Sequence, residues 1–223
     1  MNIFGFDSLP STNTYAIEHF DEYQHLDIIL AQVQTAGKGR KERKWSSETG
    51  GLYFTVILKP AAPELEKLSS LTQIMAISVC KAVRNLGAKA YLKWPNDVLY
   101  KGKKFCGILS EAVMSGNTFK GLVIGVGVNI EQKNIVSDKP FTSLEKMGVK
   151  VSKSVLIENI FSHFESMPKE DFKNEFKKLC LTFGKEITVD GKTGIFEDID
   201  DCGRLILKTP QGRETIIAGD VNF

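Results

Sequence analysis

Apolar residues recur at three- and four-residue steps between positions 65 and 86, a spacing that places them on one face of an α-helix. The positions concerned are Leu65, Leu68, Leu71, Met75, Val79, Val83 and Leu86. Gly87 follows directly, and glycine commonly stands just after the end of a helix. The pattern therefore predicts an amphipathic helix that ends near residue 86.

Short runs with strand-like composition surround this helix, at residues 28–33, 52–58 and 90–93. Further along, residues 105–114 and 119–128 flank a Ser-Gly-Asn turn, which predicts an antiparallel hairpin. A polar loop is expected from residue 131 to 140. Two more helices follow, with apolar faces made of Leu156, Ile160, Phe161 and Phe164 and of Phe172, Phe176 and Leu179. These elements predict an α+β fold, a mixed sheet covered by helices.

After Phe183 the sequence pattern changes to short strands separated by turn residues about every ten positions. This spacing is typical of a small barrel. The turns are Asp190-Gly191, Asp201-Cys202-Gly203 and Gln211-Gly212. We therefore expect two domains, residues 1–183 and 184–223. The second has only about forty residues, which is marginal for independent folding, so we expect it to be stabilised by packing against the first.

Composition is that of an ordinary globular chain: 223 residues, 42% hydrophobic and 25% charged. No apolar run approaches the roughly 18 to 20 residues of a membrane span, and the N-terminus lacks the basic flank of a secretory signal. A cytoplasmic protein with no membrane partner is expected. The cysteines Cys80, Cys106, Cys180 and Cys202 lie far apart, which indicates reduced thiols rather than a zinc site or a disulfide framework.

Net charge is only +2, too balanced to indicate a nucleic-acid partner, but one segment is strongly basic. In residues 34–45, Gly37-Lys38-Gly39-Arg40 is followed by Lys41, Arg43 and Lys44, with Glu42 the one opposing charge. Glycine lets a backbone approach a ligand, and lysine and arginine favour phosphate or carboxylate. A solvated surface loop is the alternative. The segment is not a Walker A loop, so a P-loop fold is disfavoured.

A second candidate is Lys93-Trp94-Pro95-Asn96-Asp97, which follows a predicted strand. Pro95 fixes φ and presents Asn96 and Asp97 from a stiff turn. An ordinary Pro-Asn-Asp turn is the alternative, and Trp94 could equally be a core residue.

Three weaker signals each have an ordinary explanation. Lys104 stands directly before a predicted strand, where it could stabilise a developing anion or be one more surface lysine. Ser11-Thr12-Asn13 would normally cap a helix. The small residues of Gly125-Val126-Gly127-Val128-Asn129 indicate either tight sheet packing or close approach of a flat ligand. No Ser-His-Asp or Cys-His arrangement is suggested, so covalent catalysis by the protein is not expected.

Taken in order, these motifs resemble the catalytic domain of biotin protein ligases. They read Ser-Thr-Asn, Gln-x-x-Gly-x-Gly-Arg, Lys-Trp-Pro-Asn-Asp, Lys-x-x-Gly-Ile-Leu and Gly-x-Gly-x-Asn. The segment from Gly184 to Val221 is similar to the small SH3-like C-terminal domain of that family. The resemblance implies a sheet like that of class II aminoacyl-tRNA synthetases and biotin and lipoate ligases, followed by an SH3-like barrel.

The resemblance also implies residue roles. Positions matching the biotin pocket are Ser11, Thr12, Asn13, Gln34, Gly37, Lys38, Gly39, Arg40, Lys104 and Gly107. Positions matching the ATP side are Arg40, Arg43, Trp45, Lys93, Asn96, Asp97 and Asn129. Trp45 would stack on adenine, Asn129 would meet the adenine edge, and Arg40, Lys104 and Asp97 would serve catalysis. The resemblance assigns no metal-binding residue. The metal ion that it implies is the Mg²⁺ that accompanies ATP.

The implied reaction joins biotin and MgATP into biotinyl-AMP, then passes biotin to a lysine of the biotin carboxyl carrier protein of acetyl-CoA carboxylase. A lipoate or octanoate ligase of the same superfamily is the nearest alternative. A module that binds biotin without catalysis is another.

Two departures from the family pattern stand in the basic loop. That loop usually reads Gly-Arg-Gly-Arg-x-Gly-Arg, whereas this chain has Lys38 for the first arginine and Glu42 for the third glycine. The chain also starts directly in the catalytic segment, without the winged-helix segment of the bifunctional repressors, so no DNA partner is expected. An exposed sheet edge makes a homodimer a further possibility.

Overall fold

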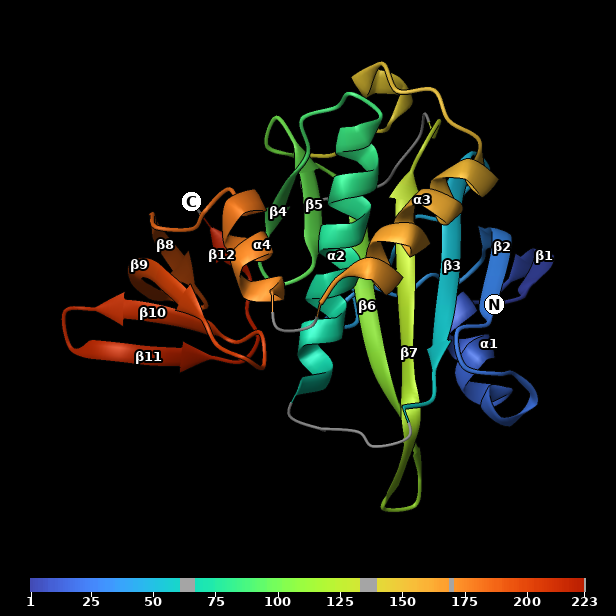
Figure 1. The fold of residues 1–223 in the computed structure, drawn as a ribbon, viewed down its shortest axis with the longest axis horizontal. Coiled ribbons are helices and arrows are strands. Elements are labelled where there is room, and N and C mark those ends of the chain that lie inside the picture. Colours follow the sequence, from blue (N-terminus) through green and yellow to red (C-terminus); the bar gives the residue numbers. More distant parts are fainter. Residues whose placement is uncertain (61–66, 133–139, 169–170, 223) are drawn as a thin grey trace. The chain divides into compact units, whose positions relative to one another are not determined.

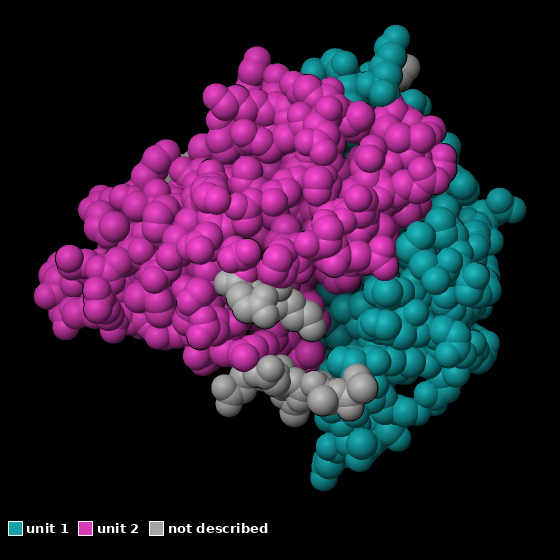
Figure 2. Space-filling model, viewed as in Figure 1, with its two compact units in different colours: residues 1–63, 102–150 teal, residues 64–101, 151–223 magenta. Residues whose placement is uncertain are grey.

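The computed structural model describes residues 1–60, 67–132, 140–168 and 171–222 (Figure 1). Contacts divide the chain into two units (Figure 2). Unit 1 comprises residues 1–63 and 102–150, and unit 2 comprises residues 64–101 and 151–223. This division follows packing, and the boundary expected at residue 184 stays a prediction.

Unit 1 is built on a sheet in which neighbouring strands follow the order β1-β2-β3-β7-β6 (Figure 1). The strands are β1 (Ile3–Leu9), β2 (Ile28–Gln34), β3 (Gly51–Leu58), β6 (Lys103–Ser115) and β7 (Thr118–Asn129). β1 pairs with β2 in parallel, and the remaining pairs are antiparallel. The mixed sheet and the long hairpin predicted from the sequence are therefore confirmed.

The core of unit 1 lies between this sheet and helix α1 (Thr12–Glu18), which is followed by the 3₁₀ turn η1 (Phe20–Glu22). Ala16 and Phe20 pack against apolar residues from β2, β3 and β7, among them Ile29, Ile57 and Val123. All eight residues of β3 are buried, as expected for a strand covered on both faces. The packing fixes α1 against β2, β3 and β7, and so fixes the position of its first turn. A second 3₁₀ turn, η3 (Glu145–Met147), also belongs to unit 1.

The described part of unit 2 before residue 184 contains three helices and a short hairpin. They are α2 (Leu68–Asn85), β4 (Tyr91–Lys93), β5 (Asp97–Tyr100), α3 (Lys153–Ser166) and α4 (Phe172–Leu179). α2 matches the predicted helix, and Gly87 follows its end with a left-handed φ of 92°. α3 and α4 both contact α2, so the two later helices are also confirmed. Leu65 and most of the loop expected at 131–140 lie outside the described residues.

The C-terminal part of unit 2 is an antiparallel sheet of strands in the order β11-β10-β9-β8-β12. These strands are β8 (Glu186–Val189), β9 (Lys192–Ile199), β10 (Leu205–Thr209), β11 (Gly212–Ile216) and β12 (Val221–Asn222). Each expected turn joins two of them. Up to residue 222 the sheet is open, so the structure does not reproduce the barrel expected for this segment. β12 has only two residues, and both pair with β8.

The four cysteines are free thiols, three of them buried, as the sequence indicates. Within the described ranges, no helix combines the length and the apolar character that a membrane crossing requires.

Candidate functional site

The first turn of α1 supplies three adjacent polar residues that the sequence singles out. Ser11 is the N-cap, with an extended backbone, and its hydroxyl accepts from the Thr14 amide at 3.4 Å. The capping explanation is thus confirmed for Ser11. Thr12 and Asn13, only 3% and 4% exposed, have side-chain partners elsewhere in unit 1.

Gln34, at the end of β2, ties this turn to the segment after the basic loop. Its Oε1 accepts from the Thr12 amide at 2.8 Å and from the Thr12 hydroxyl at 3.2 Å. Its Nε2 donates to Ser47 Oγ at 2.7 Å, and Ser47 donates to the carbonyl of Trp45 at 3.1 Å. Two of the predicted biotin-pocket residues therefore touch each other.

The network continues from Asn13 into the sheet. Thr55, fully buried in β3, donates to Asn13 Oδ1 at 2.7 Å and lies 2.8 Å from the Thr12 hydroxyl. The amide nitrogen of Asn13 donates to the Leu109 carbonyl at 3.1 Å and to Glu111 Oε2 at 2.7 Å. Buried polar groups are costly unless they are hydrogen-bonded, so a network this complete holds Asn13 in one orientation.

Glycines on β6 and β7 form the surface beneath these side chains. A Cβ atom on Gly125 would stand 2.1 Å from Asn13 Oδ1, and one on Gly127 would stand 2.3 Å from Trp45 Nε1. Gly107 pairs with Gly127 across the hairpin, and its Cβ would meet the Trp45 ring at 3.0 Å. We refer to Gly107, Gly125 and Gly127 as the glycine floor. The side chains of Asn13 and Trp45 pack closely on these glycines, as the tight-packing explanation expects, and the approach of a flat ligand stays a prediction.

Lys104 and Trp45 meet above this floor. The Lys104 ammonium lies 4.9 Å from the centre of the indole ring, within cation–π range. The indole nitrogen of Trp45 is buried and has no hydrogen-bond partner among the described residues. A buried donor without an acceptor costs free energy, so a ligand acceptor placed there would be stabilised.

The basic loop is a tight hairpin rather than a structureless stretch. The amide of Trp45 donates to the Gly37 carbonyl at 2.9 Å, and that of Gly39 donates to the Arg43 carbonyl at 2.7 Å. At its tip, Lys41 and Glu42 take left-handed φ values of 55° and 57°. A type I′ turn demands this of both central residues and favours glycine or asparagine there. Glu42 therefore stands in a glycine-type conformation, at the position where the resembled pattern has glycine.

The loop's cations differ in exposure. Lys38 and Arg43 are exposed, and Arg40 is half-buried. Gly37 is buried, and a Cβ there would stand 2.5 Å from the Trp45 carbonyl, so this glycine is required by space.

Asn129, predicted to meet the adenine edge, ends β7 and is 2% exposed. Its amide nitrogen donates to the Thr142 carbonyl at 3.1 Å, and its oxygen accepts from Gln132 at 3.4 Å. Here it anchors the segment after residue 140, and its nucleotide role stays a prediction.

Two family descriptions match this chain, together with relatives and solved structures. The Biotin/lipoate A/B protein ligase family matches residues 5–129 of the 223, more than half of the chain. The chain belongs to this family. The Biotin protein ligase C terminal domain matches residues 182–223.

Individual relatives and solved structures that resemble this chain also carry the names of biotin ligases. The Bifunctional ligase/repressor BirA of Bacillus spizizenii is 31% identical over 216 residues, covering 88% of this chain and 66% of its own length. The Biotin--[acetyl-CoA-carboxylase] ligase of Paracoccus denitrificans is 29% identical and covers 96% of this chain and 97% of its own. The Biotin protein ligase from Aquifex aeolicus in complex with biotin and ATP superposes with a TM-score of 0.82 at 27% identity, covering 99% of this chain and 97% of that one. This chain thus spans about two thirds of the Bacillus relative.

The remaining predicted residues of the ligase site, Lys93, Asn96 and Asp97, belong to unit 2. Lys93 ends β4, Asp97 begins β5, and the two pair across the hairpin. Asn96 is 8% exposed, and the Trp94–Pro95 peptide bond is cis. Their assignment to ATP stays a prediction, as do the individual roles of the unit 1 residues.

Three residues of the network were missed by sequence reasoning: Ser47, Thr55 and Glu111. Thr55 left a signal, because it is the one aliphatic hydroxyl inside the apolar run of β3. Glu111 gave a weaker one, as a carboxylate within a β-rich run. Ser47 gave none.

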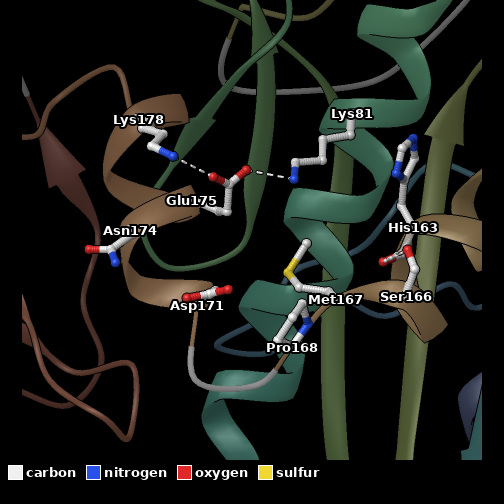
Figure 3. Close-up of a pocket in the computed structure, with 9 residues that line it drawn as sticks. All are labelled: Lys81, His163, Ser166, Met167, Pro168, Asp171, Asn174, Glu175 and Lys178. Carbon is white, nitrogen blue, oxygen red and sulfur yellow. Dashed lines mark hydrogen bonds and ion pairs between the residues drawn. The ribbon is translucent and has the colours of Figure 1, made fainter.

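Unit 2 also holds a cavity of about 330 Å³ among α2, α3 and α4 (Figure 3). Glu175 lies at its wall, with Lys81 Nζ at 2.5 Å and Lys178 Nζ at 2.7 Å. His163 Nε2 is 3.0 Å from the amide nitrogen of Asn85. These groups satisfy one another, and we assign no ligand to the cavity. Among the described residues, no three histidine, cysteine or acidic side chains gather as a metal-binding group.

Proposed function

We propose that this chain activates biotin with ATP and transfers it to a lysine of a carrier protein. The observation that carries the proposal is the glycine floor, with neutral hydrogen-bonding groups at one end and Lys104 with Trp45 at the other. Support comes from the similar fold of the Aquifex aeolicus ligase, which was solved with biotin and ATP.

The shape of the site fits a molecule with a neutral polar head and an acidic tail. Gly125 and Gly127 are two residues apart on β7, so Asn13 and Trp45 lie over points about 7 Å apart along the strand. The ureido group of biotin carries one acceptor and two donors, which suits the amides and hydroxyls of Thr12, Asn13 and Gln34. Lys104 would attract the carboxylate at the other end.

The chemistry needs no nucleophile from the protein. A carboxylate oxygen of biotin attacks the α-phosphorus of ATP, the bond to the β-phosphate oxygen breaks, and pyrophosphate leaves. The amine of the acceptor lysine then attacks the acyl carbon of biotinyl-AMP, loses a proton, and AMP leaves. Lys104 and the cations of the hairpin hold anions together and neutralise charge in the transition state. Mg²⁺ would be brought to the site bound to the phosphates of ATP.

For the acceptor, we propose the biotin carboxyl carrier protein of acetyl-CoA carboxylase, in line with the name of the Paracoccus denitrificans relative. We further propose that the enzyme pairs through β1. This strand stands at the end of the strand order, and its Ile3 and Phe4 are 45% and 37% exposed. Sedimentation velocity with and without biotin and ATP tests the dimer, and a single monomeric species under both conditions would refute it.

ATP–pyrophosphate exchange tests the reaction. We expect exchange that depends on biotin and does not occur with lipoate. Exchange with lipoate alone would make the chain a lipoate ligase. A chain that binds biotin without exchange would be a binding module. Transfer is then measured with the carrier protein, and a carrier whose acceptor lysine is replaced serves as the control.

A further inference from the structure

One buried carbonyl oxygen in unit 2, that of Gly203, receives hydrogen bonds from two separate elements. Trp94 donates its indole nitrogen at 3.0 Å, and Gln73 of α2 donates its side-chain amide at 2.5 Å. Trp94 is 1% exposed and Gln73 is 2% exposed. A carbonyl oxygen has two lone pairs, so both donors can be satisfied by this one atom.

The turn that carries Gly203 is rigidly built. Asp200 Oδ1 accepts from the amides of Cys202 at 3.0 Å and Arg204 at 2.8 Å, and Asp200 Oδ2 accepts from Arg204 Nε at 2.6 Å. Lys173 of α4 lies 2.5 Å from Asp201 in the same turn. The turn therefore presents its carbonyl in a fixed place.

Gly203 cannot be replaced without disturbing this arrangement. Its φ is 78°, a left-handed value that favours glycine. A Cβ atom there would also stand 2.8 Å from Gln73 Oε1 and 2.9 Å from Gln73 Nε2. Backbone conformation and space thus both select glycine at the point of contact.

Stability alone does not account for Gln73. Its Oε1 is buried without a hydrogen-bond partner in the part of the chain that the structure describes. An unpaired buried acceptor is destabilising, and an apolar side chain of similar volume would avoid that cost. Among the described residues, the interaction that explains a glutamine here is its donation to Gly203.

The contact bears on the turn after β4, because Trp94 is the first residue of that turn. Lys93 and Asp97 pair on either side of it, so a fixed indole leaves the residues between them little freedom. We propose that Gln73 is a positioning residue. Through the shared Gly203 carbonyl it holds Trp94, and so orients Asn96 and Asp97 toward the nucleotide. The inference rests on the proposed function, since it takes ATP as the ligand of this turn.

The test is Gln73→Met in the full chain, which keeps the side-chain volume and removes the donor. We expect the Kd for ATP, measured by calorimetry, and the KM for ATP in pyrophosphate exchange to rise about fivefold, the scale of one hydrogen bond. The KM for biotin stays within about twofold, and the midpoint of thermal unfolding does not fall, since the unpaired Oε1 is removed as well. Trp94→Phe should weaken ATP binding in the same direction.

Ser78→Ala is the matched control, because Ser78 is buried in the same helix and its hydroxyl bonds to the Ile74 carbonyl at 2.7 Å. It should leave the ATP constants unchanged. The inference is overturned if Gln73→Met keeps its Kd for ATP within twofold, if it weakens biotin equally, or if the unmodified chain does not bind ATP. A chain that binds ATP without biotin-dependent exchange would refute the proposed function and leave the calorimetric comparison intact.

Discussion

Gly125→Ala is the sharpest test of the glycine floor. The added Cβ would stand 2.1 Å from Asn13 Oδ1 and 2.8 Å from its Cγ. Nonbonded carbon and oxygen atoms keep about 3.2 Å or more apart, so Asn13 must move by about 1 Å. Asn13 has nowhere easy to go, because Thr55, Leu109 and Glu111 all bond to its amide.

A displacement of about 1 Å in a positioning group can cost on the order of a hundredfold in rate. We therefore expect kcat/KM for biotin, measured by pyrophosphate exchange, to fall about a hundredfold. The free energy of unfolding should fall by about 1–3 kcal/mol, as in other overpacked sites. Urea titration followed by fluorescence measures that loss.

Gly5→Ala is the matched control, since Gly5 lies in β1 and nothing stands within 4 Å of its Cβ position. Removing the flexibility of glycine there should be neutral or stabilising by roughly 0.5–1 kcal/mol, with kcat/KM unchanged. If Gly125→Ala kept biotin turnover within twofold of the unmodified enzyme, the placement of the ligand over this floor would be wrong.

Three further predictions concern the hairpin and the charges of unit 2. Arg40→Ala should keep the fold but release biotinyl-AMP into solution faster, because the guanidinium that would hold the bound adenylate is removed. Chromatography of the free adenylate measures this release, and an unchanged rate would refute the proposed role of Arg40. Glu42→Gly should relieve backbone strain of about 1 kcal/mol at φ 57°, seen as slower amide exchange in residues 39–43, and faster exchange would contradict it. Hydrogen bonds from Lys178 and Lys81 lower the pKa of Glu175. The contribution of the ionised Glu175 side chain to stability is therefore complete above the pKa of the carboxyl group in the unfolded chain and is lost as pH falls through the lower folded pKa. Glu175→Gln should lower the unfolding midpoint at pH 7, and this penalty should shrink as pH falls below the unfolded pKa toward about 3.

The exposed Glu158 of α3 supplies the control for the last of these. Glu158→Gln should change the midpoint little at either pH, since exposed charges contribute little to stability. A Glu175→Gln penalty as large at pH 3 as at pH 7 would show that packing of the side chain, and not its charge, is responsible.

Glu42 is a departure from the family pattern, and the structure shows its conformational consequence. The family pattern has glycine at this position, and the hairpin gives Glu42 a φ that glycine adopts without cost. The chain keeps the turn and accepts local strain in a loop that carries the site's cations.

The sequence by itself determined the elements whose pattern is local. The period of α2, the β-rich composition of β6 and β7 and the turn residues between strands act over a few neighbouring positions, so these elements could be predicted from the sequence. β1 and β5 were not predicted. It also indicated Thr12, Asn13, Gln34, Trp45 and Lys104, which the structure gathers in unit 1.

Only the tertiary structure decided what these residues touch. Asn13 and Glu111 are 98 positions apart, and Trp94 and Gly203 are 109 apart. No local periodicity encodes such pairs, because they depend on how sheet order and helix packing bring distant segments together. The same holds for the open C-terminal sheet, whose two-residue last strand pairs with β8. Short-range preferences fixed the pieces, and long-range packing chose which buried polar groups would satisfy one another.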